Sequence, residues 1–266
     1  MKITFYGYNA FIIEAGDKKI AIDPGALFLY YFRMTTVIPK EQWPGITHIF
    51  VTHGDPDHYW HADRVAKVSG APVIMNHTMV REVNGKPLAL GPRSKGLAFT
   101  TEFDRYVTLG VDEEVSVDGV SVTGLKTTHG PLTFKIGRFR VGTVTPGPEE
   151  RVGWGAIGFH MQFDGVSIVN LGDTFLHAEE WSQIDSPDLL MVPIGGREIH
   201  NTMDEAEALE AVKVIKPKLV IPCHYNCLGL FSRKYNPADD AWFKNSVIEA
   251  GYRCEILQMG QSLSLK

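Results

Sequence analysis

The sequence has few of the features that mark secreted or membrane-spanning proteins. Its three cysteines, Cys223, Cys227 and Cys254, are an odd number without a repeating spacing, which favours buried free thiols in a reducing compartment over a disulfide framework. No apolar run approaches the roughly 18 residues of a membrane-spanning helix. The N-terminus shows no secretory signal pattern. We therefore expect a cytoplasmic protein without membrane contact.

Positive charge is also not in excess. The chain carries 26 Lys and Arg against 31 Asp and Glu, for a net charge of −5. Nucleic-acid-binding domains usually present a basic surface, so we expect no nucleic-acid partner. A length of 266 residues with 44% hydrophobic content allows a core of good size. We predict a single domain over 1–266, built of two strand-rich halves of about 1–152 and 153–266.

The most informative segment is 52–58, which reads THGDPDH and directly follows the apolar run 46–51. It therefore lies where a strand ends and a turn begins. Gly54 and Pro56 favour a compact loop, which would direct two imidazoles and several carboxylates toward one point. Imidazole and carboxylate together are ligands that a divalent transition-metal ion prefers.

The same pattern, a strand that ends in a His or Asp, recurs further along the chain, at His129, Asp173 and His224. If these strands lie side by side, their ends meet at one edge of the fold. The resulting cluster would contain four histidines and three aspartates: His53, Asp55, Asp57, His58, His129, Asp173 and His224. Seven such ligands are enough for two divalent cations that share one bridging carboxylate.

Apolar runs and alternating patterns predict strands in both halves, with amphipathic helices between them. The helices are expected over 59–68, after a capping-box pattern that begins at Thr202, and over 237–250. Helices with one apolar face need a sheet to cover, so we predict a sandwich with sheets inside and helices outside. Three segments are predicted to be irregular insertions, or in the first case a loop or short helix: 26–45, 84–105 and 131–152.

The order of these motifs resembles the metallo-β-lactamase superfamily along nearly the whole chain. The resemblance rests on His53-x-Asp55-x-Asp57-His58 after a strand, then His129, Gly172-Asp173-Thr174 and His224. Further motifs resemble its ascorbate-phosphate-lactonase-like branch: 2–5, 22–24, 193–195, 202–203 and 221–226. Within this branch, Tyr8-Asn9 is a departure from the usual His-Ser or His-Ala.

The resemblance implies an α/β (α+β) fold, a four-layer αββα sandwich with a dinuclear metal site. It implies a first metal at His53, Asp55 and His129, a second at Asp57, His58 and His224, and a bridging Asp173. The cofactors would be two divalent ions, Zn, Mn or Fe. The family usually has His where this chain has Asp55, and the added carboxylate favours the harder ions Mn²⁺ and Fe²⁺.

The function implied is that of a metal-dependent hydrolase. Two cations lower the pKa of a bridging water, and the resulting hydroxide would attack an ester, lactone or phosphodiester of a small polar or anionic substrate. Asp57 would orient the hydroxide and relay a proton. Two alternatives stay open: an iron-dependent oxygen or redox enzyme on the same fold, and a non-catalytic metal-binding protein.

Substrate contacts are predicted for four residues near the strand ends: His200, Tyr225, Asn226 and Arg197. Specificity would depend on the three insertions, which carry no motif and leave the substrate unnamed. Aromatic side chains between 28 and 43 suit either internal packing or a contact between the subunits of a homo-oligomer.

Overall fold

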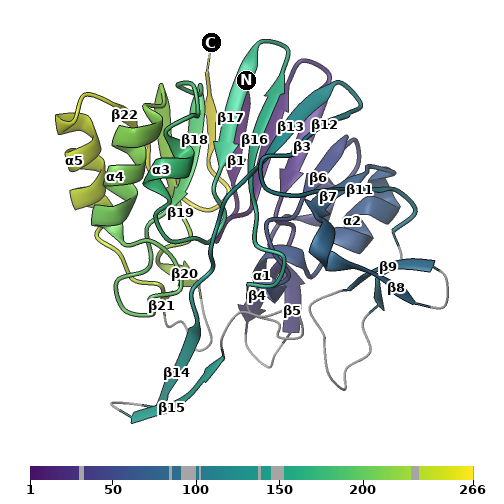
Figure 1. The fold of residues 1–266 in the computed structure, drawn as a ribbon, viewed down its shortest axis with the longest axis horizontal. Helices are drawn as coiled ribbons and strands as arrows, with labels where there is room; N and C mark the ends of the chain where they lie inside the picture. The colour runs from purple at the N-terminus through teal and green to yellow at the C-terminus, as the bar shows by residue number, and fades with distance from the viewer. Residues whose placement is uncertain are drawn as a thin grey trace.

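The computed structural model describes residues 1–29, 33–83, 86–90, 100–101, 103–136, 139–144, 153–228 and 234–265. Two seven-stranded sheets lie face to face in the middle of the molecule, with helices on both outer sides (Figure 1). The predicted four-layer αββα sandwich is therefore confirmed. Among the described residues, no helix has the length and apolar character that crossing a bilayer requires.

The first sheet has the strand order β11-β7-β6-β3-β2-β1-β23. Its strands are β1 (Lys2–Phe5), β2 (Phe11–Ala15), β3 (Lys18–Ile22), β6 (His48–Phe50), β7 (Val73–Asn76), β11 (Tyr106–Leu109) and β23 (Ser262–Ser264). Strands β1, β2 and β3 pair antiparallel, whereas β3, β6, β7 and β11 pair parallel. The parallel group sends the carboxyl ends of its strands to one edge of the sheet.

The second sheet has the strand order β12-β13-β16-β17-β18-β19-β22. Its strands are β12 (Glu114–Val117), β13 (Val120–Leu125), β16 (Gly158–Phe163), β17 (Val166–Asn170), β18 (Leu189–Pro193), β19 (Leu219–Cys223) and β22 (Arg253–Cys254). A hairpin turn at Asp164-Gly165 joins β16 to β17, and both of its residues have positive φ. The sheets do not divide at residue 152, because β12 and β13 join the second sheet and β23 joins the first.

Five α-helices cover the two sheets in the described part of the chain: α1 (Pro56–Tyr59), α2 (Ala62–Ser69), α3 (Ala178–Trp181), α4 (Glu205–Ile215) and α5 (Asp240–Glu249). Figure 1 shows α2 on one side of the sandwich and α3, α4 and α5 on the other. The helix predicted over 59–68 is confirmed from Ala62 onward as α2, with Gly70 as its C-cap, whereas Tyr59 belongs to the separate short helix α1. The N-cap of α4 is Asp204 rather than Thr202.

Three layers of apolar side chains hold these four layers together. Phe11, Phe50 and Phe159 belong to the core between the sheets. A second cluster lies on the outer face of the first sheet, where Ile12 and Ile49 belong to the same core as Val65 of α2. The third lies on the outer face of the second sheet, between strands β17 to β19 and helices α3 to α5. Because successive strand residues point to opposite faces, each central strand contributes to two of these layers.

The insertions contain more regular structure than the sequence predicted. They form the hairpins β4 (Ala26–Leu29) with β5 (Arg33–Thr36) and β14 (Leu132–Ile136) with β15 (Phe139–Val144), and a sheet of β8 (Val80–Val83), β9 (Lys86–Leu90) and β10 (Thr100–Thr101). The 3₁₀ turns η2 (Lys40–Gln42) and η3 (His77–Met79) adjoin them. The prediction of irregular segments is wrong for these strands, which pair locally and so need no long apolar period. The remaining parts, 30–32, 84–85, 91–99, 102, 137–138 and 145–152, lie outside the described residues.

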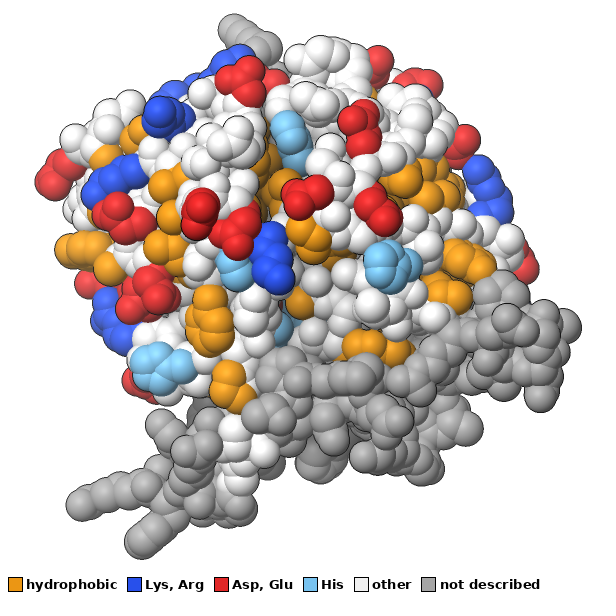
Figure 2. Space-filling view, in the orientation of Figure 1, with side chains coloured by type: hydrophobic (Ala, Val, Ile, Leu, Met, Phe, Trp, Pro, Cys, Tyr) orange, Lys and Arg blue, Asp and Glu red, His pale blue; other side chains and the backbone are white. Residues whose placement is uncertain are grey.

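The hairpins gather at one end of the sandwich. Figure 1 shows β4–β5, β14–β15 and the short pair β20 (Cys227–Leu228) and β21 (Lys234–Tyr235) at the same end as α1. On the face drawn in Figure 2, acidic and basic side chains are interspersed rather than gathered into a patch of one sign. The end that carries the hairpins is also the end at which the strands deliver their polar residues.

Candidate metal centre

The seven predicted ligands reach one place because four strands end there. His53 follows β6 of the first sheet, whereas His129, Asp173 and His224 follow β13, β17 and β19 of the second. Strands β13 and β17 run in the same direction, and β17 is parallel to β18 and β19. Their carboxyl ends therefore share an edge, which the β6–α1 loop faces from the other sheet.

A first group of ligands consists of His53, His129 and Asp173, whose candidate ligand atoms all lie within 4.8 Å of one another. Asp55 joins this group. Its Oδ2 lies 3.4 Å from Nε2 of His53 and 3.5 Å from Nε2 of His129. Its Oδ1 accepts a hydrogen bond of 2.9 Å from the backbone N–H of Gly153, which fixes the carboxylate plane. All four side chains are buried.

A second group consists of Asp57, His58 and His224, again within 4.8 Å of one another. Oδ2 of Asp57 lies 3.4 Å from Nε2 of His224 and 3.5 Å from Nε2 of His58. The side chain of Asp57 is 17% exposed, whereas both imidazoles are buried. Asp57 is therefore the ligand candidate of this group that a solvent molecule or a substrate can reach.

Asp173 lies between the two groups. Its Oδ2 is 2.9 Å from Nε2 of His224, 3.6 Å from Nε2 of His58 and 3.7 Å from Nε2 of His129. The structure thus brings all seven predicted side chains together, with Asp173 in the position that a bridging carboxylate needs.

The polar atoms of this cluster are arranged as metal ligands rather than as hydrogen-bond partners of one another. Nε2 of His53, Nε2 of His58 and Oδ1 of Asp173 are buried and make no hydrogen bond to any described residue. Buried polar groups without partners are rare in native folds, and each needs an explanation. Imidazole nitrogens and carboxylate oxygens that converge within a few ångströms are the donor set of a divalent transition-metal ion.

The outward-facing nitrogens of the histidines, by contrast, all have partners. Nδ1 of His58 lies 2.7 Å from Oδ2 of Asp23, and Nδ1 of His129 lies 2.6 Å from the carbonyl oxygen of Gly130. Nδ1 of His53 contacts Oγ1 of Thr52 at 3.1 Å. Such contacts fix the ring orientation and leave Nε2 directed at the centre.

Two of the supporting residues were not assigned such a role from the sequence. Asp23 directly follows β3, so the strand-end pattern could have identified it. Asn236 contacts Nδ1 of His224 at 3.1 Å and Oδ1 of Asn201 at 3.1 Å. No periodicity or motif marks Asn236, which follows the short strand β21.

The electrostatics of the cluster reflect its crowded carboxylates. Burial by itself would lower the pKa of His224, but Asp173 and Asp57 outweigh burial and raise that pKa to about 9. The same balance raises the pKa of His58 well above its usual range, with Asp173 and Asp57 as the main opposing charges. Without a cation, the cluster therefore favours protons on His58 and His224 as counter-charge, whereas burial lowers the pKa of His53.

The backbone at the end of β19 is held in an unusual conformation. His224 has φ 49° and Tyr8 has φ 51°, both in the left-handed region that residues with side chains seldom adopt. The backbone N–H of His224 donates to the carbonyl oxygen of Tyr8 at 2.7 Å, which joins the two turns. Backbone strain of this kind concentrates at functional sites.

Three of the four residues predicted to contact substrate have partners of their own. Nη2 of Arg197 pairs with Oε1 of the buried Glu205 at 2.6 Å, and Nδ2 of Asn226 donates to the carbonyl oxygen of Ala238 at 3.2 Å. Tyr225 packs against the outer core of the second sheet, where burial raises its pKa. His200 is exposed in the loop before α4. Their role toward a substrate stays a prediction.

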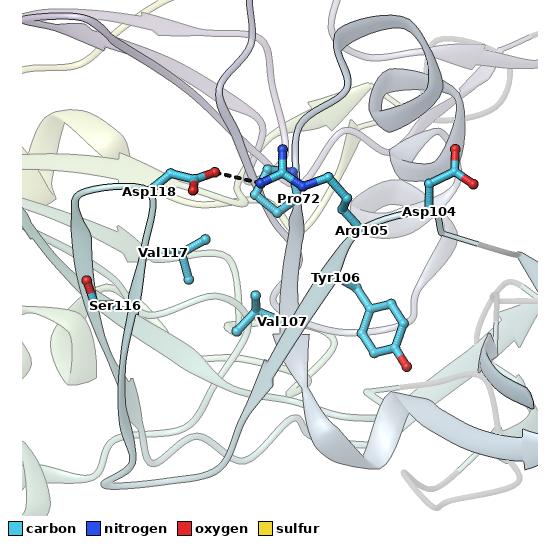
Figure 3. A pocket seen from close by; sticks show the side chains of 8 residues that line it. All are labelled: Pro72, Asp104, Arg105, Tyr106, Val107, Ser116, Val117 and Asp118. Atoms are coloured by element: carbon cyan, nitrogen blue, oxygen red, sulfur yellow. Dashed lines mark hydrogen bonds and ion pairs between the residues drawn. The ribbon is translucent and has the colours of Figure 1, made fainter.

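A separate hollow of about 410 Å³ lies at the other end of the strands, between the beginnings of β7 and β13 (Figure 3). Arg105 crosses it, and its Nη2 pairs with Oδ2 of Asp118 at 2.8 Å while Nη1 donates to the carbonyl oxygen of Gly70 at 3.2 Å. The guanidinium of Arg105 is therefore already paired. The residues that line this hollow do not form a group of convergent metal ligands like the one in the cluster.

Comparison with known proteins gives concordant matches. A model of the beta-lactamase superfamily domain matches residues 2–224. A UPF0173 metal-dependent hydrolase of Pelotomaculum thermopropionicum is 34% identical over 269 residues, covering 100% of both chains. The metallo hydrolase Igni18 of Ignicoccus hospitalis aligns with a TM-score of 0.67 and 22% identity, over 100% of this chain and 99% of that one. The metallo-beta-lactamase fold protein YhfI of Bacillus subtilis aligns with a TM-score of 0.62 and 12% identity, over 99% of both. At these identities, the two structures show a shared fold.

Proposed function

Because the chain belongs to the metallo-β-lactamase superfamily and, within it, to the UPF0173 metal-dependent hydrolases, we propose that it hydrolyses an ester, lactone or phosphodiester bond with two divalent metal ions. The small polar or anionic substrate follows from the resemblance to the ascorbate-phosphate-lactonase-like branch. One observation supports the proposal most: two groups of His and Asp ligands share Asp173.

Each group has the same composition. His53, His129 and Asp55 would hold one ion, His58, His224 and Asp57 would hold the other, and Asp173 would bridge them. A pair of bound divalent cations supplies a water of lowered pKa and stabilises negative charge on the oxygen of the scissile group. The protein supplies the arrangement, because the histidines are oriented through their Nδ1 contacts and Asp55 through Gly153.

Asp57 would move the proton. Its carboxylate is partly exposed, and the imidazoles of His58 and His224, against the effect of burial, hold its pKa well below the usual range. The low pKa keeps this carboxylate ionised, so it can orient a nucleophile by accepting its hydrogen bond and can carry the proton only briefly, on its way to a leaving group.

Asp55 favours a harder ion than zinc. Three carboxylates surround the two ions, where a histidine at position 55 would leave two. Oxygen ligands favour Mn²⁺ and Fe²⁺ relative to an all-imidazole set. This donor set also supports the second candidate, an iron-dependent oxygen or redox enzyme, which oxygen consumption by the iron-loaded protein would distinguish.

Metal analysis followed by an activity screen tests the proposal. Protein purified without chelators is expected to contain about two Mn, Fe or Zn ions per chain. The same preparation, supplemented with its own metal, is then assayed on a panel of carboxylic esters, lactones and phosphodiesters. Turnover that disappears with a chelator and returns with the metal supports hydrolysis. Folded protein that binds none of the three ions would overturn the proposal. Protein that binds one ion per chain and turns over no substrate of the panel would favour a non-catalytic metal-binding protein.

A further inference from the structure

Two buried side-chain amides lie directly behind the metal cluster, where the two sheets meet. Asn9 follows β1 in the first sheet, and Asn170 is the last residue of β17 in the second. Both are 0% exposed. A polar pair at this depth between two apolar sheets is costly unless its hydrogen bonds are complete.

The hydrogen bonds of this pair are complete. Nδ2 of Asn9 donates to Oδ1 of Asn170 at 3.0 Å, and Nδ2 of Asn170 donates to Oδ1 of Asn9 at 2.9 Å. The second acceptor position on Asn9 receives the thiol of Cys223 at 3.3 Å, and the second donor of Asn170 contacts Sδ of Met191 at 3.6 Å. An amide pair joined by two opposed hydrogen bonds resists both rotation and separation.

One arm of the pair leads to the second group of metal ligands. The remaining N–H of Asn9 donates to Oδ2 of Asp23 at 2.6 Å. The same carboxylate oxygen lies 2.7 Å from Nδ1 of His58. Asp23 is also held by the backbone N–H of Thr52 at 2.8 Å and by its hydroxyl at 2.6 Å. His58 is thus oriented by a carboxylate that Asn9 helps to fix.

The other arm leads to the bridging carboxylate. Oδ1 of Asn170 accepts a hydrogen bond of 3.0 Å from the backbone N–H of Gly172, the residue before Asp173. Gly172 has φ 62°, and a Cβ there would lie 2.8 Å from Cβ of Thr52. The loop that carries Asp173 therefore approaches the first sheet as closely as only glycine permits.

We propose that Asn9 and Asn170 are positioning residues that set the distance between His58 and Asp173, and so complete the second metal site. This inference rests on the proposed dinuclear centre. Hydrogen bonds and one covalent step connect the pair to both ligands, and Nε2 of His58 faces Oδ2 of Asp173 at 3.6 Å. The first site is expected to be less affected, because His129 and Asp55 are oriented by Gly130 and Gly153, which do not contact the amide pair.

Substitution of the pair by apolar groups tests this assignment. In Asn9→Leu, Asp23 loses a donor and Asn170 is left unpaired. The double variant Asn9→Leu/Asn170→Leu removes both side-chain amides, so no unpaired side-chain amide remains buried, and the backbone N–H of Gly172 is the donor that loses its acceptor. Asn9→Ser keeps one donor and serves as the conservative variant. Ile168→Val, in the same strand β17 and the same core, is the control for a loss of packing alone.

Each variant is freed of metal with a chelator and titrated with Mn²⁺, followed by electron paramagnetic resonance, and with Zn²⁺ in competition with a chromophoric chelator. Wild-type protein and Ile168→Val are expected to bind two ions and to show the spectrum of a coupled Mn²⁺ pair. The Leu variants are expected to bind one ion normally and the second about 10–100-fold more weakly, with the spectrum of isolated Mn²⁺. Asn9→Ser should lie between them.

The outcomes separate the two proposals. A folded double variant that binds both ions with wild-type affinity and retains the coupled spectrum would overturn the role of the amide pair alone. If both ions bind more weakly, and to the same extent, in the Leu variants and in Ile168→Val, the role of the amide pair is also overturned. General destabilisation of the fold would then explain the loss of metal affinity. Wild-type protein that binds neither Mn²⁺ nor Zn²⁺ would overturn the proposed metal centre, and this inference with it.

Discussion

Asp57 is the residue whose chemistry and exposure differ most from those of the other ligands. It combines a lowered pKa with a partly open position, whereas Asp55 and Asp173 are buried. We expect Asp57→Asn to keep a ligand oxygen but lose the proton acceptor, which lowers kcat/KM by about 10²–10⁴-fold. Steady-state kinetics with metal content measured on the same sample checks this. Full activity with full metal content in Asp57→Ala would exclude Asp57 from catalysis.

Arg197 distinguishes a substrate contact from a structural ion pair. Its guanidinium binds Glu205, whose side chain is 3% exposed and also accepts the backbone N–H of Asp239 at 2.6 Å. Arg197→Met would leave a buried carboxylate with one partner fewer. We expect a loss of about 1–2 kcal/mol in the free energy of unfolding, reduced because the arginine itself is half exposed.

Urea unfolding and KM, measured on the same Arg197→Met preparation, decide between the two roles. The ion pair alone predicts lower stability with an unchanged KM. A raised KM at unchanged stability would instead assign Arg197 to the substrate.

Single residues also show how much of the site could be predicted from the sequence. His53, His129, Asp173 and His224 could be predicted to meet because each comes within a few residues of the end of an apolar strand, and strand ends are visible in the sequence. Asn9, Asn170 and Asn236 could not, because a buried amide looks like a turn residue until its partner from the other sheet is known. The partnership depends on tertiary packing, which no local pattern encodes.

At the level of elements, helix α4 shows the limit of a capping pattern. Thr202 was predicted as the N-cap. The side chain of Asp204 instead accepts hydrogen bonds from the backbone N–H groups of Ala206 and Glu207 at 2.9 and 3.0 Å. The side chain of Glu207 in turn accepts a hydrogen bond from the backbone N–H of Asp204. Thr202 and Asp204 are both suitable N-cap residues and lie two positions apart, and the sequence does not show which of them caps the helix. Thr202 is instead buried, and its hydroxyl bonds to the backbone of Thr174, the residue after Asp173.

The two residues should therefore differ when substituted. We expect Asp204→Ala to lose about 1 kcal/mol in the free energy of unfolding, as for other N-caps, with metal affinity unchanged. Thr202→Val should weaken metal binding, because the loop that carries Asp173 loses two hydrogen bonds to its neighbour. Urea unfolding and metal titration of the pair, side by side, check this. Equal loss of metal affinity in both variants would contradict the distinction.

The insertions were mispredicted for a related reason. Hairpins β4–β5 and β14–β15 pair locally, outside the two large sheets, and β4 and β5 show no alternation of apolar and polar residues. Strand β14, with the sequence LTFKI, does alternate, so the sequence alone could have predicted it. The sandwich itself was predictable, because its central strands are apolar on both faces and its helices on one. The insertions, on which we expect substrate choice to depend, lie at the end of the molecule where these hairpins gather (Figure 1).

On the scale of the whole molecule, the metal cluster joins the two sheets. His53, Asp55, Asp57 and His58 come from the loop after β6, and the other three ligands come from the second sheet. A bound ion would therefore link the two halves of the sandwich, and binding to the folded state alone raises stability in proportion to ln(1 + [metal]/Kd). Removal of metal should lower the unfolding temperature of the entire domain rather than of one loop.

The pH dependence of this effect has a definite sign. In the metal-free protein, the pKa of His224 is raised from 6.5 to about 9, and those of His58 and His129 are also raised. A raised pKa stabilises the folded state fully below the unfolded value of 6.5, and this contribution is lost as pH rises through about 9. Metal binding requires neutral imidazoles, so metal affinity rises over the same interval.

We therefore expect the difference in unfolding temperature between metal-loaded and chelator-treated protein to widen from pH 6.5 to pH 9. Differential scanning calorimetry at several pH values, with a fixed excess of free metal, measures it, and a difference that narrows with rising pH would show that these histidines are not the metal ligands.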